Sequence, residues 1–416
     1  MHVLMATLGS MGDLLPFLGL GLELRTRGHR VTFIASGAFE PLVKGNGFEF
    51  REVVTVEEYR KALDHPNLWS RYRSYDAFFR VTILPSIRRV YDAIIECRTP
   101  GQTVVAAPGY VLGARVACEK LDMPLATCHL APVQFRSTYE NRRLPPFTLP
   151  DWAPRGVKRA LFALGDLATD GVVGPPLNAL RTELGLPRVK RIVWHWWNSP
   201  QLILGLFPGW FARPQPDWPP QTRLTGFPLC EASPQAPLDP GLLRFLDSGD
   251  PPIVFTAGTG MTQGGEFFRT SLEACQALGV RGVFLTRYRE QIPQNLPESV
   301  LHVDFAPFGF ILPRAKVFVH HGGIGGMSHA IAAGVPQLVR PMAMDQPDNA
   351  YRMLRLGIGL SLSPRSYQAQ AVAEALEQLA RSAEILERCR HWAGQVSSEK
   401  AIGQACDHIE ELGPKA

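Results

Sequence analysis

Apolar residues along the first half of the chain recur in short runs that predict strands alternating with helices. The continuous apolar run at 2–8 is typical of a strand buried on both faces. A helix is expected over 16–27, where a proline lies near its first turn and Gly28 ends it. Similar apolar runs, also expected to be strands, follow at 31–35, 48–53, 103–107 and 124–128. This alternation predicts a parallel, doubly wound α/β sheet, whose ligands bind at the carboxyl ends of the strands.

Two longer segments interrupt the alternation. Residues 67–98 and 130–197 are rich in aromatic side chains. Aromatic helices outside the core of a doubly wound domain often line a cleft for an apolar ligand, and the alternative is an enlarged ordinary core. The residues chosen as candidate contacts of such a ligand are Phe78, Phe79, Phe135 and Trp194.

A proline-dense stretch divides the chain. Nine prolines fall within 207–240, and proline disfavours both helix and sheet interiors. We therefore predict a linker over 207–250, a first domain over 1–206 and a second domain over 251–395. The strand and helix alternation resumes at residue 253.

Composition narrows the class of protein. The 416 residues carry a net charge of +5 without any run of like charge, which argues against nucleic-acid binding. The seven cysteines are dispersed and none forms a Cys-x-x-Cys pair, which argues against a disulfide framework or structural zinc and favours the cytoplasm. The apolar segment 3–24 contains glycines, a proline and two carboxylates, so it is not a signal peptide. Peripheral contact with the inner face of the membrane and the oligomeric state stay open.

The most specific motif is VFVHHGGIGGMSHAIAAGVPQLVRPMAMDQPDN, at 317–349. It predicts a strand, a turn, a small-residue helix over 327–333, and a second strand. Unused N–H groups and the helix dipole at such a turn bind anions, and His321 adds a donor. The turn is built on Gly322, Gly323, Gly325 and Gly326. Asp345 and Gln346 follow the second strand, where they can bind hydroxyls, so a diphosphate joined to a sugar is the indicated ligand.

The segments HHGGIGG, AGVPQLVRP and DQPDNA resemble the donor-binding signature of the family 1 glycosyltransferases. The resemblance runs over nearly the whole chain and implies the GT-B fold, with two Rossmann-like domains facing a cleft. It implies an acceptor-binding first domain, a second domain that binds a nucleotide sugar, and a final helix, 396–416, that returns to the first domain. It also implies an inverting hexosyltransferase that uses no metal and no cofactor besides the nucleotide-sugar substrate.

The same resemblance assigns roles to residues. In GSMGDLLPF, Asp13 matches the general base, which is aspartate in bacterial antibiotic and sterol transferases, and Gly12 lies beside it on the acceptor side. Spacing alone also allows Asp13 to be a helix cap. His329 stands where many members carry a glutamate that binds ribose. The implied donor contacts are Gly258, Thr259, His321 and the four turn glycines on the diphosphate, Phe305 on the base, and Asp345 and Gln346 on the sugar.

Further segments are similar to the catalytic subunit of the bacterial rhamnosyltransferases of rhamnolipid synthesis. They are GSMGDLLPFLGL, VKR and SPQ within 189–201, LFPGWFARPQPDWP and TGFPL. This likeness implies transfer of L-rhamnose from dTDP-L-rhamnose to a hydrophobic acceptor such as a 3-(3-hydroxyalkanoyloxy)alkanoate lipid. A UDP-glucose-dependent glucosyltransferase acting on sterols, flavonoids or other natural products is the alternative. A nucleotide-sugar epimerase and a non-catalytic binder are minor alternatives, and a dinucleotide oxidoreductase is disfavoured by the spacing of Gly9 and Gly12.

Overall fold

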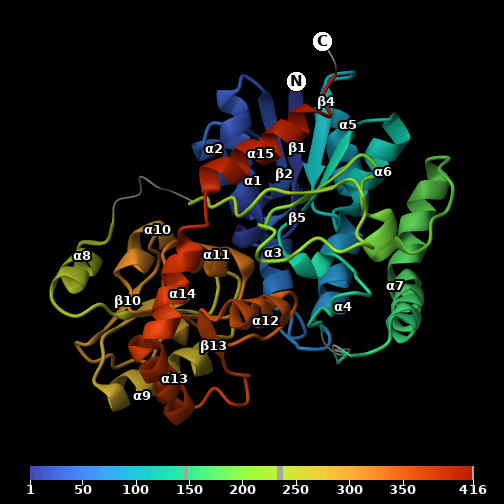
Figure 1. The fold of residues 1–416 in the computed structure, drawn as a ribbon. Helices are drawn as coiled ribbons and strands as arrows, with labels where there is room; N and C mark the ends of the chain where they lie inside the picture. The colour runs from blue at the N-terminus through green and yellow to red at the C-terminus, as the bar shows by residue number, and fades with distance from the viewer. Residues whose placement is uncertain (145–148, 151, 232–237, 415–416) are drawn as a thin grey trace. The chain divides into compact units, whose positions relative to one another are not determined.

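The computed structural model describes residues 1–144, 149–150, 152–231 and 238–414. By its internal contacts the chain divides into two compact units. Unit 1 comprises Met1–Pro228 and Ser397–Ala416, and unit 2 comprises Leu229–Val396. Figure 1 shows the ribbon of both units.

Unit 1 is built on a seven-stranded sheet in the order β3-β2-β1-β4-β5-β6-β7, and every pairing is parallel. The strands are β1 (His2–Ala6), β2 (Arg30–Ser36), β3 (Glu49–Val54), β4 (Thr103–Ala107), β5 (Leu125–His129), β6 (Leu202–Gly205) and β7 (Thr222–Leu224). The three central strands β1, β4 and β5 are wholly buried, which explains their continuous apolar sequence. Strand order reverses beside β1, so β1 and β4 mark the switch point where such sheets bind ligands.

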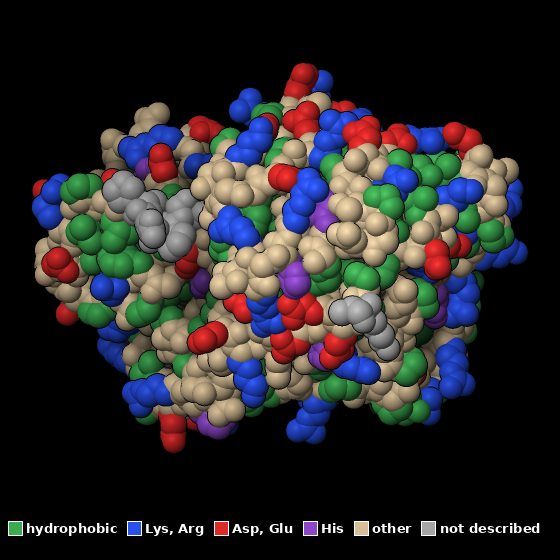
Figure 2. All heavy atoms as spheres, turned by 90° about the horizontal axis from the view of Figure 1, so that it is seen from above, with side chains coloured by type: hydrophobic (Ala, Val, Ile, Leu, Met, Phe, Trp, Pro, Cys, Tyr) green, Lys and Arg blue, Asp and Glu red, His purple; other side chains and the backbone are tan. Residues whose placement is uncertain are grey.

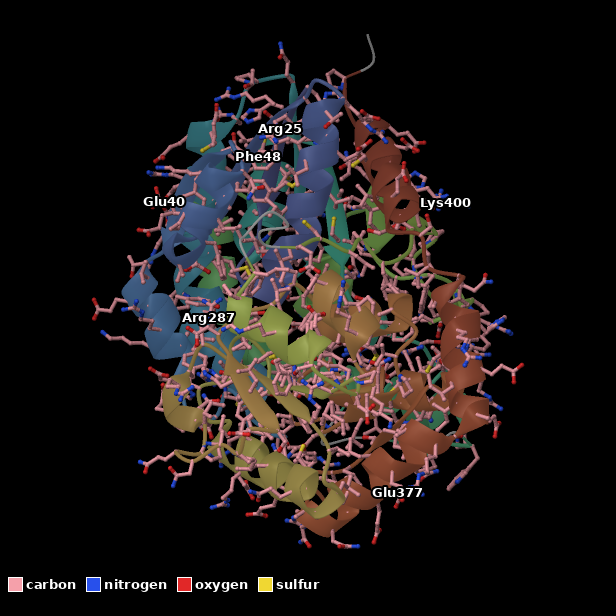
Figure 3. The ribbon with its side chains drawn as sticks, turned by 90° about the vertical axis from the view of Figure 1, so that its left-hand side faces the viewer. Arg25, Glu40, Phe48, Arg287, Glu377 and Lys400 are labelled. Carbon is pink, nitrogen blue, oxygen red and sulfur yellow. The ribbon has the colours of Figure 1, made fainter. Side chains whose placement is uncertain are left out.

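The helices of unit 1 cover this sheet. They are α1 (Met11–Thr26), α2 (Glu40–Gly45), α3 (Val56–Leu63), α4 (Ser74–Phe78), α5 (Leu84–Cys97), α6 (Leu112–Leu121), α7 (Arg155–Glu183) and α15 (Ser398–Glu410). Helix α1 begins at Met11, earlier than the expected residue 16, because Ser10 and Asp13 form a reciprocal cap ahead of Pro16. Figure 3 shows Arg25 of α1 beside Phe48, and its guanidinium lies 4.5 Å from the centre of that ring.

The C-terminal helix α15 packs on α1. Arg27 forms ion pairs with Asp407, at 2.6 Å, and with Glu410, at 2.8 Å. The buried thiol of Cys406 lies 3.6 Å from the carbonyl oxygen of Leu20. The last helix is therefore an integral part of unit 1, although the chain reaches it only after unit 2.

Unit 2 contains a six-stranded parallel sheet in the order β10-β9-β8-β11-β12-β13. Its strands are β8 (Ile253–Thr256), β9 (Gly282–Leu285), β10 (Val300–Val303), β11 (Val317–His320), β12 (Gln337–Val339) and β13 (Gly359–Ser361). Its helices are α8 (Pro240–Asp247), α9 (Gly265–Leu278), α10 (Phe308–Ile311), α11 (Ile324–Ala332), α12 (Gln346–Leu356), α13 (Ala369–Arg381) and α14 (Ala383–Ala393). The prediction of two parallel α/β sheets is confirmed.

The proline-dense segment contains regular structure that its composition did not predict. Strand β7 pairs with β6 alone and forms an edge of the sheet, where nearby prolines are tolerated. Helix α8 starts with Pro240, and Asp239 caps it by accepting the N–H of Leu242 at 2.9 Å. The expectation that the proline-dense stretch 207–240 resists helix and sheet is contradicted at these two places, because the prolines there lie near a sheet edge and in a first helical turn. The linker over 207–250 stays a prediction.

Surface charge, helix hydropathy and cysteine pairing complete the description of the fold. Lys and Arg side chains alternate with Asp and Glu over the face in Figure 2. Within the described part of the chain, no helix is both long and apolar enough to cross a bilayer. None of the seven cysteines, all of which lie in that part, forms a disulfide.

Candidate active site

Asp13 lies in the first turn of α1, beyond the carboxyl end of β1. Its Oδ2 accepts hydrogen bonds from the backbone N–H of Ser10, at 2.7 Å, and from the Ser10 hydroxyl, at 3.0 Å. A Cβ atom on Gly9 would lie 2.1 Å from this oxygen, so only glycine leaves room for the carboxylate. Asp13 thus caps the helix with one oxygen, and Oδ1 stays outside the cap.

The second carboxylate oxygen of Asp13 is held by a residue from the loop after another strand of the same sheet. The Tyr110 hydroxyl, between β4 and α6, donates a hydrogen bond of 3.0 Å to Asp13 Oδ1. Phe78 packs edge-on against the Tyr110 ring at 5.4 Å, and Phe79 packs edge-on against Phe78 at 6.4 Å. Two of the aromatic residues predicted on the acceptor side are therefore linked to Asp13 through Tyr110, and Gly12 is exposed beside it.

The surroundings of Asp13 favour its protonated form. Burial raises the pKa of Asp13 above its ordinary value, and the hydrogen bonds from Ser10 and Tyr110 oppose that rise only in part. A carboxylate with a raised pKa accepts a proton more readily at neutral pH than an exposed aspartate does. Its position and its basicity both suit a general base.

The other two predicted acceptor contacts lie in different surroundings. Phe135 is buried, stacks on Trp218 at 4.4 Å and meets Phe207 edge-on, so its ring packs in the core. Its contact with an acceptor stays a prediction. Trp194 is half-buried, and the guanidinium groups of Arg136 and Arg142 lie 4.1 and 4.9 Å from the centre of its indole ring.

In unit 2, the glycine turn leads directly into α11. Gly322 has φ +93, in the left-handed region that favours glycine, and Gly323 precedes the first helical residue. Gly325 and Gly326 lie inside the first turn of the helix, which begins at Ile324 and not at the expected residue 327. Backbone N–H groups of a first helical turn have no partner within the helix, so this end offers donors and the positive end of a dipole to an anion.

His321 lies at the start of this turn, between two glycines. A Cβ on Gly258 would lie 2.7 Å from its Cε1, and a Cβ on Gly323 would lie 2.5 Å from its Nε2. Its Nδ1 is buried, and no hydrogen-bond partner for it is found among the described residues. Burial lowers the pKa of His321 to about 4, so the ring is neutral at neutral pH and carries one N–H donor. Thr259, next to Gly258, is exposed.

His320, the preceding residue, is fully buried and structural. Its ring stacks on Phe318 at 4.5 Å, its Nδ1 accepts the N–H of Gly322, and its Nε2 lies 3.0 Å from Gln337 Oε1. Because Nδ1 accepts, Nε2 carries the hydrogen. This ring fixes the turn on which His321 stands.

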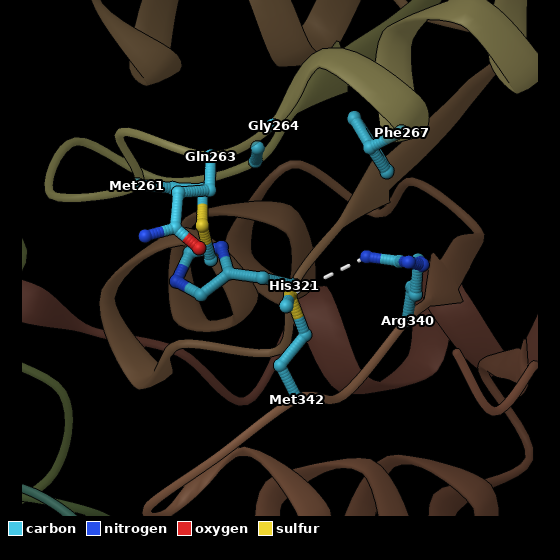
Figure 4. Close-up of a pocket in the computed structure, with 8 residues that line it drawn as sticks. Met261, Gln263, Gly264, Phe267, His321, Arg340 and Met342 are labelled. Carbon is cyan, nitrogen blue, oxygen red and sulfur yellow. Dashed lines mark hydrogen bonds between the residues drawn. The ribbon is translucent and has the colours of Figure 1, made fainter. Parts of the chain in front are cut away.

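A small pocket lies at the carboxyl ends of three neighbouring strands (Figure 4). Ala257 follows β8, His321 follows β11 and Arg340 follows β12. The pocket is completed by Met261, Gln263, Gly264, Phe267 and Met342. Arg340 is only 8% exposed, its Nη1 donates to the Met342 sulfur at 3.3 Å, and its Nε has no acceptor among the described residues. A buried cation therefore shares a pocket with His321.

Asp345 and Gln346 begin α12. The Gln346 Oε1 accepts the backbone N–H groups of Met342, at 2.8 Å, and Ala343, at 3.1 Å, which fixes the amide. Asn349 donates from Nδ2 to Asp345 Oδ2 at 2.7 Å and to the Gly322 carbonyl at 2.9 Å. These contacts hold the predicted sugar-binding pair beside the glycine turn.

Phe305 follows β10 and its side chain is 42% exposed, so the ring has a face available for stacking. His329, on α11, lies 3.6 Å from a carboxylate oxygen of Glu231 and packs against Phe308. Glu231 also accepts the N–H of Gly309 at 2.7 Å. The carboxylate of Glu231, which is distant in sequence, thus lies next to His329. The position of His329 is the one where the resemblance implies a glutamate.

Comparisons with known proteins identify the fold and the class of enzyme. Residues 3–139 match the glycosyltransferase family 28 N-terminal domain, and 283–409 match the erythromycin biosynthesis protein CIII-like C-terminal domain. An O-mycaminosyltylonolide 6-deoxyallosyltransferase of Streptomyces fradiae is 27% identical over 99% of this chain and 97% of its own length. The structure of the glycotransferase of kitacinnamycin superposes with a TM-score of 0.74 at 22% identity, over 99% of both chains. The chain is a GT-B glycosyltransferase.

A second structural neighbour has the same fold. The spinosyn rhamnosyltransferase SpnG complexed with thymidine diphosphate superposes on this glycosyltransferase with a TM-score of 0.68 at 16% identity, over 99% of this chain and all of that one. The glycosyltransferase uses a nucleotide-sugar donor. Among its described residues, no group of three or more His, Cys, Asp or Glu side chains is arranged to hold a metal ion.

Sequence reasoning missed several polar residues of the glycosyltransferase that the fold brings to these two regions. They are Ser10 and Tyr110 beside Asp13, Arg340 beside His321, and Glu231 beside His329. Tyr110 had one available signal, because it lies in the short loop that follows the buried strand β4. Arg340 had another, since a charged residue ends the apolar run of β12. Glu231 gave none, since nothing local links it to α11.

Proposed function

We propose that this glycosyltransferase transfers L-rhamnose from dTDP-L-rhamnose to a hydroxyl group of a hydrophobic acceptor, such as a 3-(3-hydroxyalkanoyloxy)alkanoate, with inversion. The observation that carries the reaction type is Asp13, a half-buried carboxylate of raised pKa held at the switch point of the first sheet. The sugar and acceptor rest on the segments shared with the rhamnosyltransferases of rhamnolipid synthesis. The thymidine diphosphate bound to a rhamnosyltransferase neighbour supports the choice of nucleotide.

In this proposal the acceptor binds to unit 1. Asp13 accepts the proton of the acceptor hydroxyl while that oxygen attacks the anomeric carbon of the sugar. Tyr110 and Ser10 fix both carboxylate oxygens, so the base loses little orientational freedom when the substrate arrives. Phe78, which is partly exposed beside Tyr110 and backed by the buried ring of Phe79, provides an apolar contact near the base, which suits an acyl chain better than a polar acceptor.

The donor binds to unit 2. The bond from the anomeric carbon to the diphosphate breaks as the new glycosidic bond forms, and negative charge develops on the leaving diphosphate. The N–H groups at the start of α11, the His321 N–H donor and the Gly258–Thr259 turn stabilise that charge. Arg340 adds a fixed positive charge near His321. Phe305 stacks on the base, while Asp345 and the amide nitrogen of Gln346 bind sugar hydroxyls.

The test is product analysis by mass spectrometry with the purified protein. Each of two donors, dTDP-L-rhamnose and UDP-glucose, is offered with a hydroxyalkanoyloxyalkanoate and, separately, with a flavonoid. A rhamnosylated lipid formed only from the dTDP donor is the expected result. Glucosylated flavonoid from UDP-glucose without any lipid product would contradict the proposed substrates and leave the reaction type standing. Donor consumption without an acceptor would indicate epimerisation or hydrolysis.

A further inference from the structure

The longest helix of unit 1, α7, exposes an apolar face to solvent. Val157, Ala160, Leu164, Leu167 and Gly171 recur at the three- and four-residue spacing of one helix face, and all of them are exposed. The exposed fractions are 48% for Val157, 63% for Leu164 and 74% for Leu167. Trp152, just ahead of the helix, is 82% exposed. We call these five helix residues the α7 face, and Figure 1 shows α7 at the outside of unit 1.

Three charged side chains of α7, those of Lys158, Asp166 and Asp170, point toward the protein. Asp166 is buried and pairs with Arg136 at 2.5 Å. Asp170 accepts the backbone N–H groups of Arg191, at 2.6 Å, and Ile192, at 2.9 Å. Lys158 is 3% exposed. Over 157–171 the usual amphipathic arrangement is therefore inverted, because Asp166 and Asp170 face the protein while Leu164 and Leu167 face solvent.

Basic side chains are exposed in the first turns of α7 and in the loop that follows it. Arg155 and Arg159 are exposed in its first turns, and Lys190 and Arg191 are exposed where the following loop meets Asp170. The third carboxylate of the helix, Glu183, stands in its last turn, far from the α7 face, and pairs with Arg88. An apolar face with an exposed tryptophan and basic neighbours fits a surface of anionic phospholipid, where apolar side chains enter the acyl boundary and basic side chains meet the headgroups.

We propose that the α7 face binds the enzyme reversibly to an anionic lipid bilayer, with the helix lying in the membrane interface. A bilayer is the inferred partner because the basic side chains beside the α7 face are complementary to anionic headgroups. It goes beyond the proposed function and does not depend on which sugar or acceptor the enzyme uses. Docking there brings the lipid phase to the part of unit 1 that carries Trp194, since Arg136 contacts both Trp194 and Asp166.

The test measures co-sedimentation of the full-length protein with vesicles in the absence of any donor. Vesicles contain equal parts of phosphatidylglycerol and phosphatidylcholine, or phosphatidylcholine alone. The wild type is expected to sediment with the anionic vesicles, less so at high salt. The double variant Leu164→Gln/Leu167→Gln is expected to partition roughly tenfold more weakly or worse. Arg159→Gln is expected to lose roughly fivefold, the effect of one basic charge near the surface.

A matched control is Leu354→Gln, a similar change at a single exposed leucine of unit 2, which is 44% exposed. It should sediment as the wild type does. Thermal unfolding and dTDP binding of the double variant should match those of the wild type, since both leucines are exposed. Equal sedimentation of the wild type and the double variant, or no sedimentation of the wild type, would overturn the proposal. A wild-type dimer that the double variant abolishes, without vesicle binding, would overturn it too and show that a second copy covers the α7 face.

Discussion

The hydroxyl of Tyr110 donates a hydrogen bond of 3.0 Å to Oδ1 of Asp13, although 97 residues separate them in the chain. The two residues meet because β1 and β4 are neighbours in a parallel sheet, so the loops at their carboxyl ends lie together. The cap formed with Ser10 holds the other oxygen. The carboxylate of Asp13 is therefore fixed by one local contact and one contact that depends on the whole sheet.

Replacing the proposed base tests the mechanism most directly. Asp13→Asn removes the proton acceptor and keeps the shape, so kcat should fall roughly 100- to 10,000-fold. Binding of dTDP, measured by calorimetry, should stay unchanged because the donor residues lie in unit 2. An Asp13→Asn enzyme with normal turnover would exclude this residue as the base.

Removal of the Tyr110 hydroxyl should change the pH profile. The hydrogen bond stabilises the ionised carboxylate, so its loss in Tyr110→Phe raises the pKa of Asp13 further. Because the ionised form is the base, the acidic limb of kcat against pH should move to higher pH, and turnover at pH 6 should fall more than at pH 8. Phenylalanine keeps the packing against Phe78. A uniform loss at every pH would indicate a purely structural role.

The variant Gly258→Ala tests whether a glycine at 258 is needed to leave room for the His321 ring. In Gly258→Ala the new Cβ would lie 2.7 Å from the imidazole, on a backbone with φ +102. Both effects oppose the native arrangement, so the free energy of unfolding should fall by about 1–3 kcal/mol and dTDP affinity should fall as well. Gly45→Ala is the control, since a Cβ there meets nothing within 4 Å and its φ is ordinary. Equal behaviour of the two variants in denaturant unfolding and calorimetry would contradict this account.

The variant Arg340→Met tests whether the charge of Arg340 contributes to folding or to dTDP binding. Burial lowers the pKa of this guanidinium, its Nε has no acceptor among the described residues, and the neighbouring carboxylate of Glu266 is exposed and 3.7 Å away, so the charge contributes little to folding. Methionine resembles Met261 and Met342 in the same pocket. The midpoint of unfolding should therefore change little, while dTDP affinity falls roughly tenfold because a charged contact to phosphate is lost. A large loss of stability with unchanged dTDP affinity would show that the charge of Arg340 stabilises the fold and does not contact the phosphates.

Local pattern predicted the parallel sheets because buried strands leave continuous apolar runs, as β4 and β5 do. The same kind of pattern predicted that α11 begins at residue 327, three residues after its start at Ile324, because glycines usually indicate a turn. In the protein, His320 accepts the N–H of Gly322 and Asn349 donates to its carbonyl oxygen, which fixes the turn at Gly322. Gly325 therefore lies in the first turn of the helix.

The fate of aromatic side chains depends on distant packing, and no local pattern reveals it. Phe135 and Phe78 look alike in sequence, yet one stacks on Trp218 in the core and the other packs beside Tyr110. The same limit applies to Tyr110 and Glu231, whose partners lie far away in the chain.

The position of α15 has a consequence for biosynthesis. All seven strands of the first sheet leave the ribosome before unit 2 is made, but the helix that covers part of α1 emerges only after unit 2. Until then the surface that receives Cys406, and the charge of Arg27, lack their final contacts. The first unit to be synthesised is thus the last to be completed, and a ribosome that stalls within unit 2 leaves behind an N-terminal half with an uncovered apolar strip.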